Sequence, residues 1–172
     1  LSLSKATCTR AINDLSASGL ISQTAEGTNK WITTAYTKSE LLEKAYGRLK
    51  TPVDRILYVK GTDQIEHPIA SGIRALARQS MIGVNDQDGA IAISKKEAAK
   101  IPAEDICTKQ YFEDFGGAVI EVWSYDPIIL ERDGCVDDIS LLLSMDNDPN
   151  ERVQTCLDEI RQKHGLPIKE EE

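Results

Sequence analysis

Residues 4–37, SKATCTRAINDLSASGLISQTAEGTNKWITTAYT, carry the most informative local pattern of the chain. Ser4 is a favoured N-cap residue, and Gly19 can adopt the left-handed conformation that ends a helix before Leu20 and Ile21 return to the core. This pattern predicts a helix over residues 5–16. Its apolar residues recur at i, i+3, i+4 and i+7, so we expect one buried stripe, made of Cys8, Ala11, Ile12 and Leu15.

The opposite side of this helix carries short hydrogen-bonding side chains, where an ordinary solvated helix would carry Glu and Lys. Thr9, Arg10 and Asn13 lie on that side, and Lys5 and Thr7 flank it in the first turn. After the helix, the β-prone runs ISQT and KWITT are separated by the polar residues 25–29, which include Gly27 and Asn29. These runs predict a β-hairpin.

A helix with the pattern xAxxTRAIxxLxxxGLI, followed by a hairpin, resembles the DNA-binding half of MarR-type transcription regulators over residues 1 to about 50. The resemblance implies a winged helix-turn-helix in which the first helix is the recognition helix and the hairpin is the wing. It implies that side chains of the helix approach base edges or phosphates in the major groove, and that the wing lies near the DNA backbone. The implied DNA-binding residues are Lys5, Thr7, Thr9, Arg10, Asn13, Thr28, Asn29 and Lys30.

The chemistry of these side chains fits DNA recognition. Arg can bond bidentately to guanine and Asn to adenine, whereas hydroxyl groups bond to phosphates. The alternative is that Arg10 and Asn13 are ordinary polar residues of a surface helix. We expect the helices that precede a recognition helix in this family to be missing from the chain, which would leave the stripe with less cover.

Charge is distributed unevenly along the chain. The formal net charge is −8, yet residues 1–60 carry nine Lys or Arg against five Asp or Glu, and residues 61–172 carry 11 against 23. Local charge is what a phosphate backbone responds to, so the overall acidity does not exclude DNA. Ordinary surface variation is the alternative explanation.

The composition indicates a soluble protein of one or two domains, since 172 residues exceed the usual domain length of about 100 to 150 residues. No apolar run is long enough to span a membrane. The four cysteines show no CxxC spacing, which argues against a structural zinc site and for free thiols in a reducing, cytoplasmic compartment. No Gly-rich phosphate loop occurs.

The remainder of the chain alternates strand-like and helix-like runs. Thr37 and Glu40 form a capping box for a helix that we expect Pro52 to stop. RILYVKG, GAIAISK and AVIEVWSYDP predict strands, and PIASGIRALARQSMI predicts one helix. Asp137 or Asp138 is expected to cap a short ISLLLS helix, and Asp148 to cap the last helix, with Pro149 in its first turn.

Residues 54–165 more weakly resemble the C-terminal region of AbiEi-type antitoxins, through the runs ASGIRALARQSMI, IEVWSYDPIIL and VDDISLLLSMDNDPNERV. This resemblance implies a repressor that controls its own operon and has a nucleotidyltransferase-like toxin as its partner. It implies no catalytic residue.

Two other functions remain open. The acidic second half could neutralise a basic protein partner, as a protein-interaction module. A metal-dependent enzyme acting on nucleotides could use Glu121, Asp126, Asp137 and Asp138 to hold two cations. However, no Lys follows Glu121 at the spacing of a nuclease motif. The Asp146 to Asn150 run also lacks the Gly and the final Glu of a calcium loop.

We therefore predict an α+β chain with a winged helix-turn-helix domain over residues 1–52. A mixed α/β effector or interaction domain with a C-terminal helix follows over residues 53–168, and residues 169–172 form an acidic tail. The predicted function is that of a repressor-like, DNA-binding transcriptional regulator. We expect double-stranded DNA as its partner, no metal, no cofactor and no membrane, and a homo-oligomer is compatible with this hypothesis.

Overall fold

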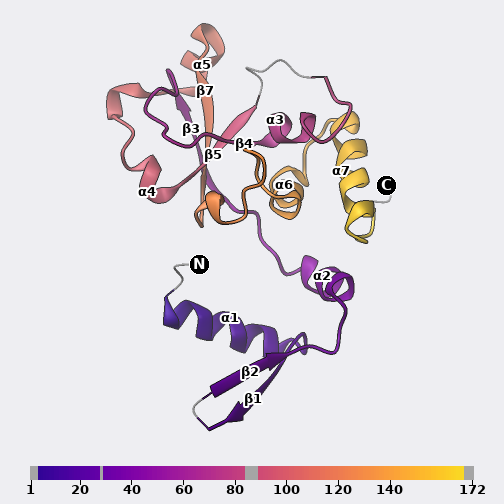
Figure 1. Cartoon of the computed structure of the whole chain (residues 1–172). Helices are drawn as coiled ribbons and strands as arrows, with labels where there is room; N and C mark the ends of the chain where they lie inside the picture. Colours follow the sequence, from indigo (N-terminus) through magenta and orange to yellow (C-terminus); the bar gives the residue numbers. More distant parts are fainter. Residues whose placement is uncertain (1–3, 28, 84–88, 169–172) are drawn as a thin grey trace. The chain divides into compact units, whose positions relative to one another are not determined.

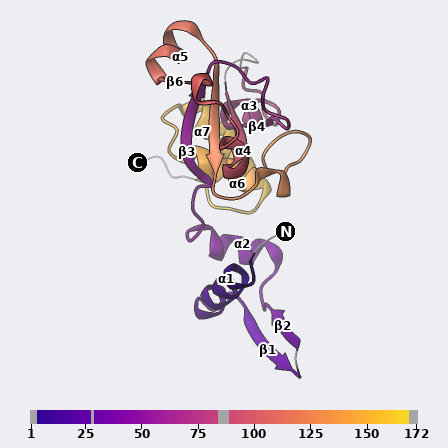
Figure 2. The ribbon, with the colours of Figure 1, turned by 90° about the vertical axis from the view of Figure 1, so that its left-hand side faces the viewer.

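The structure, a computed structural model, describes residues 4–27, 29–83 and 89–168 (Figures 1 and 2). The chain has a mixed α+β fold and forms two compact units, Leu1–Leu49 with Gln162–Glu172, and Lys50–Arg161. We expected residues 53–168 in the second domain, whereas residues 162–168 group with the first unit. The expected acidic tail, residues 169–172, lies outside the described residues.

The first helix, α1 (Lys5–Ala17), begins and ends almost where its sequence predicts. The Oγ atom of Ser4 accepts a hydrogen bond from the backbone N–H of Thr7 at 3.1 Å, which confirms the N-cap. Gly19 has a φ of +72°, and Leu20 behind it is buried. The predicted helix stop and the return of the chain to the core are therefore confirmed.

The predicted hairpin is also present, as the antiparallel strands β1 (Ser22–Glu26) and β2 (Asn29–Thr33). The strands extend into the segment that we expected to be loop, because Ala25 pairs with Lys30 and Glu26 with Asn29. Both strands are exposed along their whole described length.

The capping box at the start of α2 (Lys38–Tyr46) is confirmed in both directions. The backbone N–H of Glu40 donates to Oγ1 of Thr37, and the backbone N–H of Thr37 donates to Oε2 of Glu40 at 2.8 Å. The prediction that Pro52 stops this helix is wrong, because α2 already ends at Tyr46 with Gly47 as its C-cap. Helix, hairpin and helix follow one another in the expected order, and the winged helix-turn-helix arrangement stays a prediction.

The second unit is built on a mixed five-stranded sheet of order β4-β5-β7-β3-β6. The three longest strands, β3 (Val53–Val59), β5 (Ala90–Ser94) and β7 (Ala118–Trp123), are those that the sequence predicts. β5 and β7 are parallel, and the other neighbouring pairs are antiparallel. The short edge strand β6 (Ile106–Cys107) gave no sequence signal.

The prediction of one helix over residues 68–82 is wrong. Ile69–Ser71 form strand β4 beside β5, and only Gly72–Ala77 form helix α3. Gly72 has a φ of +55°, which separates the two elements. The backbone of Ala70 also bonds to a distant segment, donating to Gly134 and accepting from Val136. Pairing with residues far along the chain therefore overrides the helical pattern.

The two faces of the sheet pack against different elements. Alternate residues of β7 point to opposite faces, so Ile120 and Val122 share one side and Glu121 and Trp123 the other. Ile120 and Val122 belong to a core cluster that includes Ala98 of α4 (Lys95–Ala98). Figure 1 shows α4 on one side of the sheet, and α3 and α6 (Asp138–Met145) on the other. The remaining short helices of the unit are η1 (Ala103–Asp105), α5 (Lys109–Phe115) and η2 (Pro127–Ile129).

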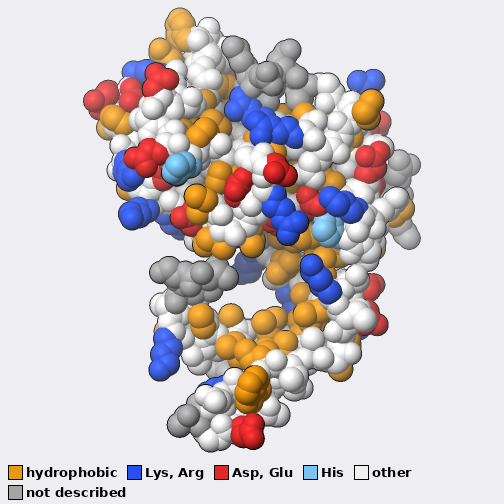
Figure 3. Space-filling model, in the orientation of Figure 1, with side chains coloured by type: hydrophobic (Ala, Val, Ile, Leu, Met, Phe, Trp, Pro, Cys, Tyr) orange, Lys and Arg blue, Asp and Glu red, His pale blue; other side chains and the backbone are white. Residues whose placement is uncertain are grey.

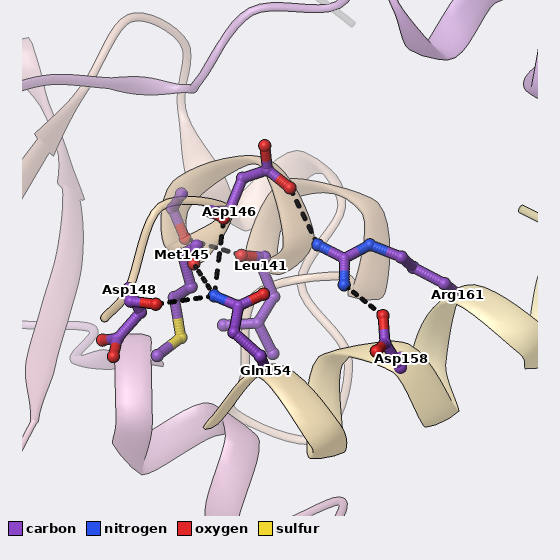
Figure 4. Close-up of polar contacts among 8 residues, drawn as sticks. Leu141, Met145, Asp146, Asp148, Gln154, Asp158 and Arg161 are labelled. Atoms are coloured by element: carbon purple, nitrogen blue, oxygen red, sulfur yellow. Dashed lines mark hydrogen bonds and ion pairs between the residues drawn. The ribbon is translucent and has the colours of Figure 1, made fainter. Parts of the chain in front are cut away.

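The corner between α6 and α7 (Glu151–Lys163) is held by polar side chains (Figure 4). Asp137 is the N-cap of α6, one of the two expected. The expected cap of α7, Asp148, instead accepts from the backbone N–H of Asn150 at 2.9 Å, and Asn150 accepts from Arg152 at 3.0 Å. α7 therefore begins two residues later than predicted. Gln154 donates its Nε2 to the backbone oxygen of Asp148 at 2.8 Å and so fixes the turn.

Candidate nucleic-acid interface

Five of the polar residues expected to contact DNA lie on the solvent-exposed surface of α1. The N-cap fixes the start of the helix and therefore the direction in which each side chain projects. Helix α1 has no fully buried residue. The five predicted residues of this helix are all exposed: Lys5, Thr7, Thr9, Arg10 and Asn13.

Local hydrogen bonds divide these five residues into two groups. The hydroxyl of Thr7 bonds to Oγ of Ser4 at 2.8 Å, and the hydroxyl of Thr9 donates to the backbone oxygen of Lys5 at 2.9 Å. Arg10 makes one long bond, from Nε to the backbone oxygen of Ala6 at 3.4 Å. Within the described residues, its terminal Nη groups and the amide of Asn13 have no hydrogen-bond partner. Arg10, Asn13 and Lys5, whose ammonium likewise has no partner among the described residues, are therefore the side chains with donors available for a ligand.

The tip of the hairpin combines one positive and one negative charge. Asn29 and Lys30 are the first residues of β2 and are exposed, while Thr28 lies outside the described residues. Glu26 pairs with Asn29 across the hairpin, beside the Ala25–Lys30 pair. A carboxylate at this place would repel a phosphate backbone. We did not predict that Glu26 would lie beside Lys30. The position of the turn sets the register of the hairpin, and this register places the two residues near each other.

The apolar stripe of α1 is not buried as expected. Cys8 and Ile12 are only half-buried, Ala11 is exposed, and Leu15 is 38% exposed. Hydrogen bonds reach α1 from the hairpin side only near its C-terminus, where Gln23 donates to Ser16 at 2.8 Å. The first turns of the helix therefore have little cover within the described part of the chain.

Apolar residues of the hairpin are exposed as well. Trp31 is 56% and Ile32 49% exposed on β2, and Figure 3 shows hydrophobic side chains gathered over α1 and the hairpin on one face. The run KWITT predicted the strand, but the pattern of its side chains did not indicate that both faces of the hairpin would be exposed. The candidate interface thus offers apolar surface next to its hydrogen-bonding groups.

The carboxylates considered for a metal-dependent enzyme have structural partners. Asp126 caps η2 by accepting from Ile128, and Asp137 caps α6. Glu121 accepts from Ser71 at 2.5 Å and from Trp123 at 3.1 Å. Among the described residues, no group of three or more His, Cys, Asp or Glu side chains is placed to hold a metal ion.

Comparison of the chain with known protein families, with curated proteins and with solved structures finds no match. Across the described residues, no helix has both the length and the apolar character needed to cross a membrane. The functional interpretation therefore depends on the geometry and charge of this chain's own residues.

Proposed function

We propose that this chain is a repressor-like, DNA-binding transcriptional regulator that reads duplex DNA with α1 and contacts the DNA backbone with the β1–β2 hairpin. One observation carries the proposal. Arg10 and Asn13 lie three residues apart on a capped helix, both are exposed, and both keep side-chain donors free among the described residues.

The side-chain chemistry supports sequence-specific contacts. Residues three apart on a helix lie on the same face, so Arg10 and Asn13 can meet neighbouring base pairs from one major groove. Arg bonds to the O6 and N7 atoms of guanine, and Asn bonds to the N6 and N7 atoms of adenine. The hydroxyls of Thr7 and Thr9 keep acceptor lone pairs, and Lys5 supplies a charge for phosphate.

The charge distribution supports binding to the phosphate backbone. Residues 1–60 carry nine Lys or Arg against five Asp or Glu. Counterion release from DNA makes binding of this kind strongly salt-dependent. The acidic remainder of the chain would limit non-specific binding, because it repels DNA outside the interface.

The test is a binding measurement on the full chain with labelled duplex DNA. Duplexes selected from a random pool are titrated at several salt concentrations and followed by fluorescence anisotropy. We expect affinity to fall linearly on a log–log plot against salt, and Arg10→Ala to cost roughly 1 to 3 kcal/mol of binding free energy. Arg152→Ala, which removes an exposed arginine of the second unit, is the matched control. Salt-independent binding, or equal losses in the two variants, would contradict the proposal.

A second candidate function is supported by the charge of the remaining chain. Residues 61–172 carry 23 Asp or Glu against 11 Lys or Arg, which suits a basic protein partner. An antitoxin that neutralises a toxin-like protein and also represses its own operon would combine both functions. Co-purification of the tagged full chain with the product of the neighbouring gene, weakened by salt, would support this candidate. Absence of any such complex at low salt would count against it.

A further inference from the structure

The second unit contains a cavity of about 550 Å³ that has no part in the proposed DNA binding or in the proposed binding of a protein partner. Its size lies within the range of small-molecule sites. The walls come from the starts of α3 and β5, from β7, and from the end of α6 with the residues that follow it. Apolar residues and backbone make up much of the lining, and the charged residues in the described lining are all acidic: Glu121, Asp146 and Asp148.

Glu121 is the unusual residue of this cavity. It lies in the middle of β7 and is only 9% exposed, a position at which strands normally carry apolar residues. Both of its hydrogen bonds, from Ser71 and Trp123, go to the same carboxylate oxygen, Oε2. The other oxygen, Oε1, has no partner among the described residues. Oε1 is not one of the fully buried polar atoms that lack a partner, so it is open to the cavity and can accept a hydrogen bond from a ligand there.

The residues around Glu121 leave room for that partner. Oε1 lies 3.8 Å from the place that a Cβ atom would occupy on Gly72, and Ala90 stands beside the same place. The small residues therefore keep space in front of the carboxylate, where larger ones would close the cavity.

The other two carboxylates of the lining are already engaged. Asp146 accepts from Arg161 at 2.8 Å (Figure 4), and Asp148 accepts from the backbone N–H of Asn150 at 2.9 Å. A bare metal ion needs several oxygen ligands at once, and the described residues form no such group here. A single open carboxylate beside apolar walls instead matches an organic cation, whose charged head pairs with oxygen and whose carbon chain needs apolar surface.

We propose that this cavity binds a small organic cation, an alkylammonium or alkylguanidinium, whose head group donates hydrogen bonds to Oε1 of Glu121. Its alkyl part lies against the apolar side chains of the lining, Ile73, Val119, Leu143 and Met145. Ser71 and Trp123 hold the carboxylate in place from its other oxygen. This inference does not depend on DNA binding.

The test uses the full chain and the fluorescence of Trp123, whose indole N–H bonds to the same carboxylate. The chain has two tryptophans, so Trp31→Phe leaves Trp123 as the single reporter. Butylammonium and butylguanidinium are titrated as probes, with neutral 1-butanol as the uncharged comparison, and calorimetry measures the same affinities. We expect saturable binding of at least one cation, about tenfold or more tighter than 1-butanol, as a charged hydrogen bond would give.

Variants decide whether Glu121 is the binding group. Glu121→Gln keeps the size and the acceptor for Trp123 but removes the charge, and we expect it to weaken cation binding about tenfold or more. Glu113→Gln, an exposed residue of α5, should leave binding unchanged. Circular dichroism checks that each variant is folded.

If Glu121→Gln does not fold, Val119→Phe gives the answer, because it narrows the cavity at a half-buried position and leaves the carboxylate intact. We expect this variant to lose cation binding. The proposal is overturned if neither cation saturates or if both bind no tighter than 1-butanol. It is equally overturned if a folded Glu121→Gln binds as the parent does, or if Val119→Phe leaves binding unchanged.

Discussion

The guanidinium group of Arg161 donates from Nη2 to Oδ1 of Asp146 at 2.8 Å, and thereby joins α7 to the residue that follows α6 (Figure 4). Its Nη1 also donates to Asp158, one turn earlier on α7, at 2.6 Å. Only 2% of the arginine side chain is exposed, whereas the two carboxylates keep 36% and 27% of their surface. A buried cation thus fixes the corner that also forms one edge of the Glu121 cavity.

Replacing Arg161 with Met should lower the free energy of unfolding by about 3 kcal/mol, because breaking a buried ion pair leaves its partners uncompensated. The two carboxylates are partly exposed and recover some hydration, so the expected loss lies at the lower end of the range for broken buried ion pairs. Urea unfolding followed by circular dichroism measures it. Arg152→Met, on the exposed side of the same helix, should change stability by less than about 0.5 kcal/mol. Equal effects of the two substitutions would show that the pair is not a stabilising element.

Gly117 should tolerate no side chain. It has a φ of +137°, and a Cβ atom there would lie 2.2 Å from the backbone oxygen of Val59, which cannot move without disturbing β3. We expect Gly117→Ala to cost roughly 3 kcal/mol, from backbone strain and the steric clash together. Thermal or urea unfolding measures the loss. Gly47→Ala is the matched control, since a Cβ atom at Gly47 meets open space and its φ of −65° suits any residue. A stable Gly117→Ala variant would contradict the close approach of β7 to β3.

The capping box of α2 should make the stability of the first unit depend on pH. The backbone N–H of Thr37, and then its hydroxyl, donate to Glu40 and lower the pKa of that carboxyl below its ordinary value of 4.5. A lowered pKa in the folded state means that the stabilisation is present above the unfolded pKa and is lost as the pH falls through the folded pKa. We expect an NMR titration to show Glu40 ionising below the ordinary value of 4.5.

Glu40→Gln provides the second half of that test. The amide keeps an acceptor oxygen for Thr37 but cannot ionise, so the acid-induced loss contributed by this residue should disappear. Unfolding of the parent and of the variant is compared at neutral pH and at a pH below the folded pKa. Identical pH profiles for the two chains would mean that the capping box does not contribute as described.

Lys30 should set part of the salt dependence of DNA binding. It is exposed on β2, beside the tip of the hairpin, and in the proposed complex it pairs with a phosphate. Lys30→Ala should weaken binding similarly for all duplex sequences and reduce the magnitude of the log–log salt slope by about 1. Lys96→Ala, in the second unit, should leave the slope unchanged. A sequence-dependent effect of Lys30→Ala would assign this residue to base contacts instead.

Local signals in the sequence determined the helix starts and the longer strands. The caps at Ser4, Thr37 and Asp137 were predicted because each is a hydrogen bond between residues at most three positions apart. Alternation and β-branched residues likewise marked β3, β5 and β7. These features depend on neighbouring residues alone, so no knowledge of the rest of the chain was needed. For the candidate interface, the sequence predicted which residues of α1 are exposed to solvent.

Only the tertiary structure decided how much of each surface is covered. The stripe that contains Ile12 and Leu15 has the spacing of a buried face, yet its residues are at most half-buried within the described chain. Ile69–Ser71 became a strand by pairing with β5, and Ala70 also bonds to residues more than 60 positions away, Gly134 and Val136. Glu121 is buried because Ser71 and Trp123 reach it across the sheet face, and Arg161 is buried against Asp146. Burial and long-range pairing depend on which distant residues come together, and a pattern of neighbouring residues does not contain that information.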